Sequence, residues 1–134
     1  MMLNTIKRHP VDLIFGGQNA GNTTARRWLG APFYAGTMPT SARSQWLASE
    51  RLLTSIHIDC IAGTGSGNAI YTVYVDGIAT AVTVVFLNAA TTGEASGFAV
   101  YVPAGCRVSV ALDKTGTITA GQTDITCMIG VLAP

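Results

Sequence analysis

Charge is the scarcest feature of this 134-residue chain. Asp, Glu, Lys and Arg make up 11% of it and hydrophobic residues 49%, whereas charged residues form about 25% of ordinary soluble domains. A monomer with so few charges has little to keep its surface soluble and free of apolar patches. We therefore expect other copies of the chain, or a larger assembly, to cover much of the surface.

Long hydrophobic runs are also missing. The longest, residues 78–90, is interrupted by two threonines and an asparagine, and it falls short of the roughly 20 apolar residues that a membrane-spanning helix needs. Near the N-terminus, the apolar residues 11–15 include Asp12 and are too few for the core of an export signal. We expect neither a membrane partner nor an export signal.

An excess of basic charge is absent as well, because the net charge is +1 at pH 7. Binding to a phosphate backbone needs a basic face, so we expect no nucleic-acid partner. The few charges are unevenly placed: residues 1–51 hold six of the eight Lys and Arg but two of the seven Asp and Glu. This asymmetry predicts that the N-terminal part docks against an acidic surface, on its own subunits or on a partner.

Cysteine is scarce, with Cys60, Cys106 and Cys127 in the whole chain. An odd number without Cys-x-x-Cys spacing argues against a disulfide framework and against a structural zinc site. Each cysteine falls on the expected inward face of a strand, where a free thiol packs as a small hydrophobe. We expect all three to be buried and reduced, as in a protein made in a reducing cytoplasm.

Alternation of apolar and polar residues is the strongest signal that is present. Residues 68–86 contain two runs with a period of two, which is typical of half-buried strands. Between them, Asp76-Gly77 fits a type I′ hairpin turn, whose two central residues need a positive φ. We predict a long β-hairpin at the centre of an antiparallel sheet, with these inward residues: Tyr71, Val73, Val75, Val82, Val84 and Phe86.

Strand patterns continue from Arg51 to the end, and no segment between them is long enough for a crossover helix. Residues 114–123 are expected to be a polar loop. Upstream, residues 40–50 allow a short helical turn, and residues 1–25 have the composition of an extended arm, in which residues 11–15 could make a short strand. We predict an all-β fold: an antiparallel, jelly-roll-like β-sandwich of about seven to eight strands, one domain over residues 26–134, after an N-terminal arm at residues 1–25.

Catalytic groupings are not evident. His57 and Asp59 lie two apart on an outward strand face, but the other histidine, His9, lies in the expected arm, and zinc sites need three or four ligands. The glycine-rich residues 63–67 lead into a strand, whereas a phosphate-binding loop opens a helix. We expect no enzymatic activity, no cofactor and no metal. The alternative hypothesis that includes catalysis is a small β-fold enzyme that uses His57.

Residues 52–132 resemble a recurrent β-sandwich module of bacteriophage structural proteins. The resemblance lies in the order of LLTSIHIDCIAG, a glycine-rich loop, V-D-G followed by I-A-T-A-V-T-V, an A-T-T-G turn, V-P-A-G-C-R-V-S-V, a T-G-T loop and a last strand. Such modules often have Asp in the position of Cys106. Residues 1–51 lie outside the resemblance.

The resemblance implies a non-enzymatic virion structural protein, made in the host cytoplasm. Related jelly rolls serve as capsid decoration (cement) proteins, head fibres and tail-fibre tips, often as trimers. The small size favours a decoration protein, which predicts a homotrimer on the capsid surface of the virion, bound to the major capsid protein. The candidate capsid-contact residues are Lys7, Arg8, Arg26, Arg27 and Trp28.

A fibre-tip or lectin-like module that binds a host receptor is the alternative. Trp28 and Trp46 could then form an aromatic platform for a sugar, although both lie in the N-terminal part of the chain. Large aromatic residues more often serve burial, so packing in the core or at a subunit interface is the other interpretation of both tryptophans.

Overall fold

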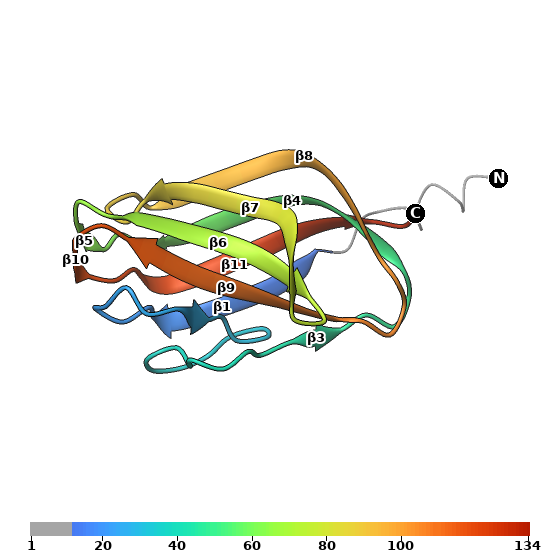
Figure 1. The fold of residues 1–134 in the computed structure, drawn as a ribbon, viewed down its shortest axis with the longest axis horizontal. Helices are drawn as coiled ribbons and strands as arrows, with labels where there is room; N and C mark the ends of the chain where they lie inside the picture. The colour runs from blue at the N-terminus through green and yellow to red at the C-terminus, as the bar shows by residue number, and fades with distance from the viewer. Residues whose placement is uncertain (1–11) are drawn as a thin grey trace.

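The computed structural model describes residues 12–134, which form strands and connecting loops (Figure 1). None of these residues belongs to a helix that could cross a membrane. In chain order the strands are β1 (Leu13–Asn19), β2 (Arg27–Trp28), β3 (Gln45–Trp46), β4 (Arg51–Ile61), β5 (Thr64–Gly65), β6 (Asn68–Val75), β7 (Ile78–Leu87), β8 (Thr92–Val102), β9 (Arg107–Thr115), β10 (Ile118–Ala120) and β11 (Thr123–Leu132).

Two antiparallel sheets face each other across the core. One has the strand order β1-β11-β4-β8, and the other has the order β2-β9-β6-β7, with β3 also paired to β9. Leaving aside β3, which like β2 pairs with β9, and the separate two-stranded sheet of β10 and β5, the chain order of the other eight strands gives sheets 1-8-3-6 and 2-7-4-5. That connectivity is the jelly roll. The predicted antiparallel jelly-roll β-sandwich is therefore confirmed.

The core lies between the sheets and follows the predicted alternation. In β6, β7 and β11 buried residues alternate with less buried ones, and each buried aliphatic side chain contributes about 1.5–3 kcal/mol relative to exposure. The four-stranded sheet contributes Phe15, Leu53, Ile56, Ile58, Ile125, Cys127 and Ile129. The five-stranded sheet contributes Tyr71, Val73, Val82, Val84, Val108, Val110 and Leu112.

The predicted hairpin is confirmed as β6 and β7, joined at Asp76 and Gly77. Their φ angles are 48° and 80°, as a type I′ turn requires. Its predicted place at the centre of a sheet is right for β6 alone, because β6 pairs with both β7 and β9 while β7 lies at the edge. Among residues 12–134, the outer side of β7 therefore pairs with no other strand.

Within the predicted arm at residues 1–25, residues 13–19 form β1, which runs past the short strand allowed at residues 11–15. Leu13 pairs with Ile129 of β11, and Phe15 is fully buried in the core. The glycine-rich composition suggested a loop, but Gly17 serves close packing, since a Cβ there would lie 2.0 Å from the sulfur of Met38. The part of the predicted arm before Asp12 lies outside the described residues.

Two further segments differ from the prediction. Residues 40–50 contain no helical turn, because Gln45–Trp46 pairs with β9 as strand β3. Residues 114–123, predicted as a polar loop, include the end of β9 and all of β10. Lys114 is buried there, and its Nζ donates a hydrogen bond of 2.7 Å to the backbone oxygen of Ala20.

The three cysteines are free, and they differ in burial. Cys127 is fully buried as predicted, while Cys60 and Cys106 are half-buried and pack against the edge of the core. Burial, assisted by the charge of Asp59, raises the pKa of the Cys60 thiol to about 11. This thiol is therefore protonated and unreactive at neutral pH.

Candidate functional site

The outer face of the five-stranded sheet brings together aromatic and charged side chains from distant parts of the chain. Residues paired across neighbouring strands point to the same side of a sheet. Trp46 of β3 pairs with Arg107, and Trp28 of β2 pairs with Ala111, while the alternate positions of β9 point into the core. We call the resulting surface the outer strip; it comprises Arg26, Trp28, Trp46, Tyr74, Arg107 and Asp113.

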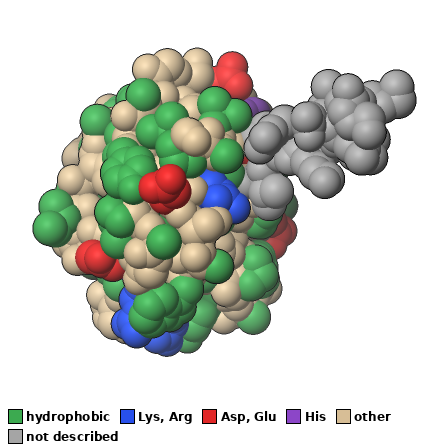
Figure 2. Space-filling view, turned by 90° about the vertical axis from the view of Figure 1, so that its right-hand side faces the viewer, with side chains coloured by type: hydrophobic (Ala, Val, Ile, Leu, Met, Phe, Trp, Pro, Cys, Tyr) green, Lys and Arg blue, Asp and Glu red, His purple; other side chains and the backbone are tan. Residues whose placement is uncertain are grey.

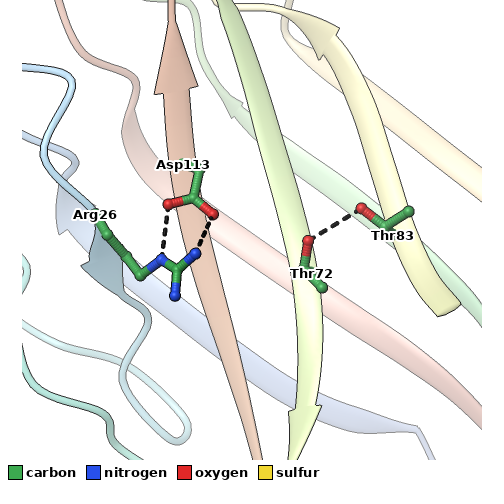
Figure 3. Close-up of polar contacts among 4 residues, drawn as sticks. All are labelled: Arg26, Thr72, Thr83 and Asp113. Atoms are coloured by element: carbon green, nitrogen blue, oxygen red, sulfur yellow. Dashed lines mark hydrogen bonds and ion pairs between the residues drawn. The ribbon is translucent and has the colours of Figure 1, made fainter. Parts of the chain in front are cut away.

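Arg26 organises one end of the outer strip (Figure 3). Its Nε and Nη2 donate hydrogen bonds of 2.7 and 3.0 Å to the two carboxylate oxygens of Asp113. Its guanidinium also lies 5.9 Å from the ring centroid of Trp28 and 5.4 Å from that of Tyr74. These two rings meet edge to face, with 5.0 Å between their centroids. The ion pair and the rings hold one another in place on the sheet surface.

Beside the outer strip, β6 and β7 present an uncharged surface (Figure 3). The hydroxyls of Thr72 and Thr83 lie 3.1 Å apart across the two strands. Thr83 donates its proton to the backbone oxygen of Tyr71 at 3.0 Å, so Thr72 is the donor in the pair. This side of the sheet offers neutral hydroxyls and aliphatic groups to a partner.

The other end of the outer strip opens into a hollow of about 460 Å³, lined by Ala42, Ser44, Asp76, Gly77, Arg107 and Ser109. Asp76 is held on both sides: its N–H donates to the backbone oxygen of Arg107 at 2.8 Å, and its carboxylate accepts the N–H of Arg107 at 2.8 Å. This backbone hydrogen bond, the Cys106 thiol and the charge of Arg107 lower the pKa of Asp76, so its carboxylate is ionised at neutral pH.

Trp46 contacts Arg107, which lines this hollow. The Arg107 guanidinium lies 4.4 Å from the centroid of its ring, and the side chain is 64% exposed. Figure 2 views the end of the sandwich at which the β6–β7 turn lies, and shows hydrophobic side chains spread over it with isolated charged groups between them. An exposed tryptophan held against an arginine is a fixed aromatic surface available to a ligand.

His57 lies on the opposite sheet, between two carboxylates. Its Nε2 is 3.1 Å from Oδ2 of Asp59 and its Nδ1 is 3.3 Å from Oε2 of Glu94. Burial lowers the pKa of His57, but the hydrogen bonds and charges of Glu94 and Asp59 together outweigh it, so the pKa is raised. Residues 12–134 contain no group of three His, Cys, Asp or Glu side chains arranged to hold a metal ion.

The predicted capsid-contact residues fall into three places. Lys7 and Arg8 lie outside the described residues. Arg26 and Trp28 lie together on the outer strip. Arg27 points away from them, since its Nη1 donates to the backbone oxygen of Met38 at 3.1 Å. The structure therefore brings two of the five residues together on one surface.

Comparisons with known proteins give neither a family nor a curated relative. No protein-family model matches the chain, and no curated protein is significantly similar to it. Among solved structures, the chain is similar to a GH26-CBM35 β-(1,4)-mannanase from Podospora anserina, with 14% identity and a TM-score of 0.46 over 96% of this chain and 29% of that one.

Two further structures are similar over most of both chains. A family 35 carbohydrate-binding module from Clostridium thermocellum has 15% identity and a TM-score of 0.41, covering 90% of this chain and 97% of that one. The Eiger TNF structure from S. frugiperda has 12% identity and a TM-score of 0.41, covering 94% of each chain. All three TM-scores are below 0.5, and the fold assignment rests on the strand order described above.

Sequence reasoning missed the partners of the candidate residues. The alternation of β6 and β9 places Tyr74 and Arg107 outward. The pairing of Trp46 with Arg107, however, joins residues 61 positions apart, and no local sequence pattern indicates that pairing. Glu94 was expected in a turn-rich connection and instead faces His57 across the β4–β8 pair. Only the strand register reveals these neighbours.

Proposed function

We propose that the protein is a non-enzymatic structural protein of a bacteriophage virion, a jelly-roll homotrimer that decorates the capsid by binding the major capsid protein. The observation that carries this proposal is the uncharged edge strand β7. Neither β6 nor β7 contains a charged residue, and Ile78, Val85 and Leu87 of β7 are 72%, 57% and 60% exposed.

A long, apolar edge strand favours assembly. Its unpaired backbone groups and aliphatic side chains are a template for another chain, and free monomers normally protect such edges with charge or proline. Covering apolar surface contributes about 25 cal/mol per Å². The proposed mechanism is mechanical: subunits cover one another's aliphatic faces, and the trimer adds contacts between capsid subunits without any chemistry.

Two other features support the phage role. The element order that resembles phage modules corresponds to β4 through β11, with V-P-A-G-C-R-V-S-V spanning the β8–β9 turn. The exposed Arg26, with Lys7 and Arg8 in the undescribed N-terminal segment, supplies basic groups for an acidic capsid surface. Under this proposal the protein is made in the host cytoplasm and resides on the virion surface.

The first test is the solution mass of the purified protein by light scattering. We expect a trimer, and we expect V85K/L87K to give monomers because each lysine would have to be desolvated in the interface. The control is T126K, which adds a lysine to an exposed position on the opposite sheet. A monomeric wild-type protein would contradict the assembly argument.

The second test is co-sedimentation with capsids made of the major capsid protein of the same virus. We expect saturable binding that weakens as salt is raised, since basic side chains are the proposed contacts. R26Q should bind less than wild type, while R43Q, which alters an arginine outside the outer strip, should bind equally. Absence of binding to any capsid form would overturn the decoration role while leaving the oligomer intact.

A further inference from the structure

The hollow at the Trp46 end of the outer strip has the chemistry of a binding site for a small polar ligand. It has a volume of about 460 Å³, within the range typical of ligand pockets. Ser109 lines it although only 4% of this residue is exposed. The lining therefore includes a hydroxyl group set into the sheet as well as groups at the rim.

The lining groups are fixed before any ligand arrives. Asp76 and Arg107 exchange two hydrogen bonds of 2.8 Å through their backbone and carboxylate groups, and the Arg107 guanidinium is stacked on Trp46. Such preorganisation reduces the entropy lost on binding. The site presents one carboxylate, one guanidinium and serine hydroxyls in a constant arrangement.

The charges indicate the class of ligand. Asp76 disfavours anions and Arg107 disfavours cations, so a neutral molecule fits best. Asp76 can only accept hydrogen bonds and Arg107 can only donate them, which suits a molecule whose hydroxyls do both. The exposed ring of Trp46 adds an apolar surface. A sugar ring combines paired hydroxyls with an apolar C–H face, and it meets all three requirements.

The outer strip extends the site beyond one sugar. Trp28 and Trp46 pair with residues of β9 that are four positions apart, which corresponds to about 13 Å along a strand. Tyr74 pairs with Ser109, at a level between the two tryptophans, but on β6 at the other side of β9. The three aromatic side chains thus share one face, with the Trp28 and Tyr74 rings in contact at 5.0 Å between centroids, and the separation of the two tryptophans in sequence is no obstacle.

We propose that the hollow and the outer strip form a binding site for a neutral oligosaccharide, with one sugar hydrogen-bonded to Asp76 and Arg107 beside Trp46, and the next sugars extending over Tyr74 toward Trp28. This site goes beyond the structural role, and it leaves β7 free for assembly because β7 is on the other side of β6. Arg26 and Trp28 of the outer strip are also the candidate capsid contacts, so a glycan that extends to Trp28 would compete with the capsid for that end of the strip.

The test begins with the intact protein on an array of neutral, sialylated and phosphorylated glycans. We expect saturable binding to a set of neutral glycans. The tightest of them is then titrated against W28F, in which Trp46 is the one remaining tryptophan, so that a change in fluorescence reports the proposed contact directly. No binding to any neutral glycan, or a preference for the anionic ones, would overturn the proposal.

Variants then locate the site. W46A should weaken the affinity at least about tenfold, as truncation of a central aromatic contact does. D76N should weaken it less while keeping the turn, because Asn also adopts positive φ. The matched control is Y101A, which removes an exposed aromatic side chain from β8 on the other sheet. Unchanged binding by both W46A and D76N, with thermal unfolding confirming that each is folded, would also overturn the proposal.

The capsid proposal and the glycan site can fail separately. Loss of glycan binding in W46A with normal trimer mass and capsid binding would assign the outer strip to the glycan alone. Loss of capsid binding in W46A, with no glycan bound by the wild type, would assign the same surface to the capsid and would reject the oligosaccharide site.

Discussion

The hydroxyl of Tyr71 donates a hydrogen bond of 2.6 Å to Oε1 of Gln122 in the middle of the core, where both residues are fully buried. The amide of Gln122 in turn donates to the backbone oxygen of Asn88 at 3.4 Å. This short chain of hydrogen bonds links β6, the end of β7 and the residue preceding β11. It joins the two sheets by polar contacts at one end of the sandwich.

We expect Y71F to lower the free energy of unfolding by about 1–3 kcal/mol, because Oε1 of Gln122 would remain buried without a donor. Urea denaturation measures this loss. The double variant Y71F/Q122M removes both partners and should be destabilised by less than the sum of the single variants. A loss below about 0.5 kcal/mol in Y71F would show that the hydrogen bond adds little.

His57 is expected to stabilise the fold more in acid than in base. Its pKa is raised in the folded protein, so the charged imidazole is favoured by Glu94 and Asp59. The contribution is fully present below the unfolded pKa of about 6.5 and is lost as the pH rises through the folded pKa. The stability difference between wild type and H57N should therefore be larger at pH 5.5 than at pH 8.

An NMR titration of the His57 ring gives the independent measurement. Its midpoint should lie above that of an unstructured histidine, and E94Q should lower it by removing one carboxylate. S96A, on the same strand as Glu94 but without a charge, should leave the midpoint unchanged. A midpoint at or below the ordinary value in wild type would contradict the described geometry.

Lys114 should act in the opposite direction. Burial and the nearby charge of Arg27 lower its pKa to about 8, below the value of about 10.4 in an unfolded chain. Between these two values the unfolded chain binds more protons at this residue, so stability rises with pH. The wild type should gain stability relative to K114M between pH 8 and pH 10. A constant difference across this range would show that Lys114 titrates normally.

Gly93 of β8 provides a test of close packing. A Cβ at this position would lie 2.2 Å from Cδ1 of Phe86, and the Phe86 ring is stacked on Tyr71 at 5.7 Å between centroids. G93A should therefore cost about 1–3 kcal/mol by overpacking, measured by thermal and urea unfolding. The control is S96A, because Ser96 is exposed on the same strand; S96A should stay within about 0.5 kcal/mol of wild type.

The parts of the fold that could be predicted are those whose signals are local. The Asp76-Gly77 turn and the alternation of β6, β9 and β11 are readable within about ten residues, and the structure confirms them. Of β1, the first part was allowed as a short strand at residues 11–15, and the rest was missed because its glycines and polar residues suggest a loop. Those glycines are needed where β1 meets Met38 and the chain near Ile125, and that requirement arises from tertiary packing.

The candidate site was less predictable, because the register of the strand pairing determines which residues share its face. Trp28 and Trp46 were noticed as aromatic residues, but their shared face depends on two short strands that pair with β9 far along the chain. The stretch at residues 40–50 allowed a helical turn by composition, and pairing with β9 makes part of it a strand instead. Long-range pairing overrides weak local propensity in such short segments.

The position of β11 determines when the molecule can fold during synthesis. Of the described strands β11 leaves the ribosome last, yet it lies between β1 and β4 in the finished sheet. Until residues 123–132 emerge, β1 lacks its partner strand and has only the bridges of Gly16 with Gly30 and of Asn19 with Thr37, and β4 lacks one of its two neighbours. The apolar strands of the nascent chain must therefore stay apart for most of translation. A chain truncated before residue 123 would aggregate, because it could not fold even to a less stable form of the sandwich.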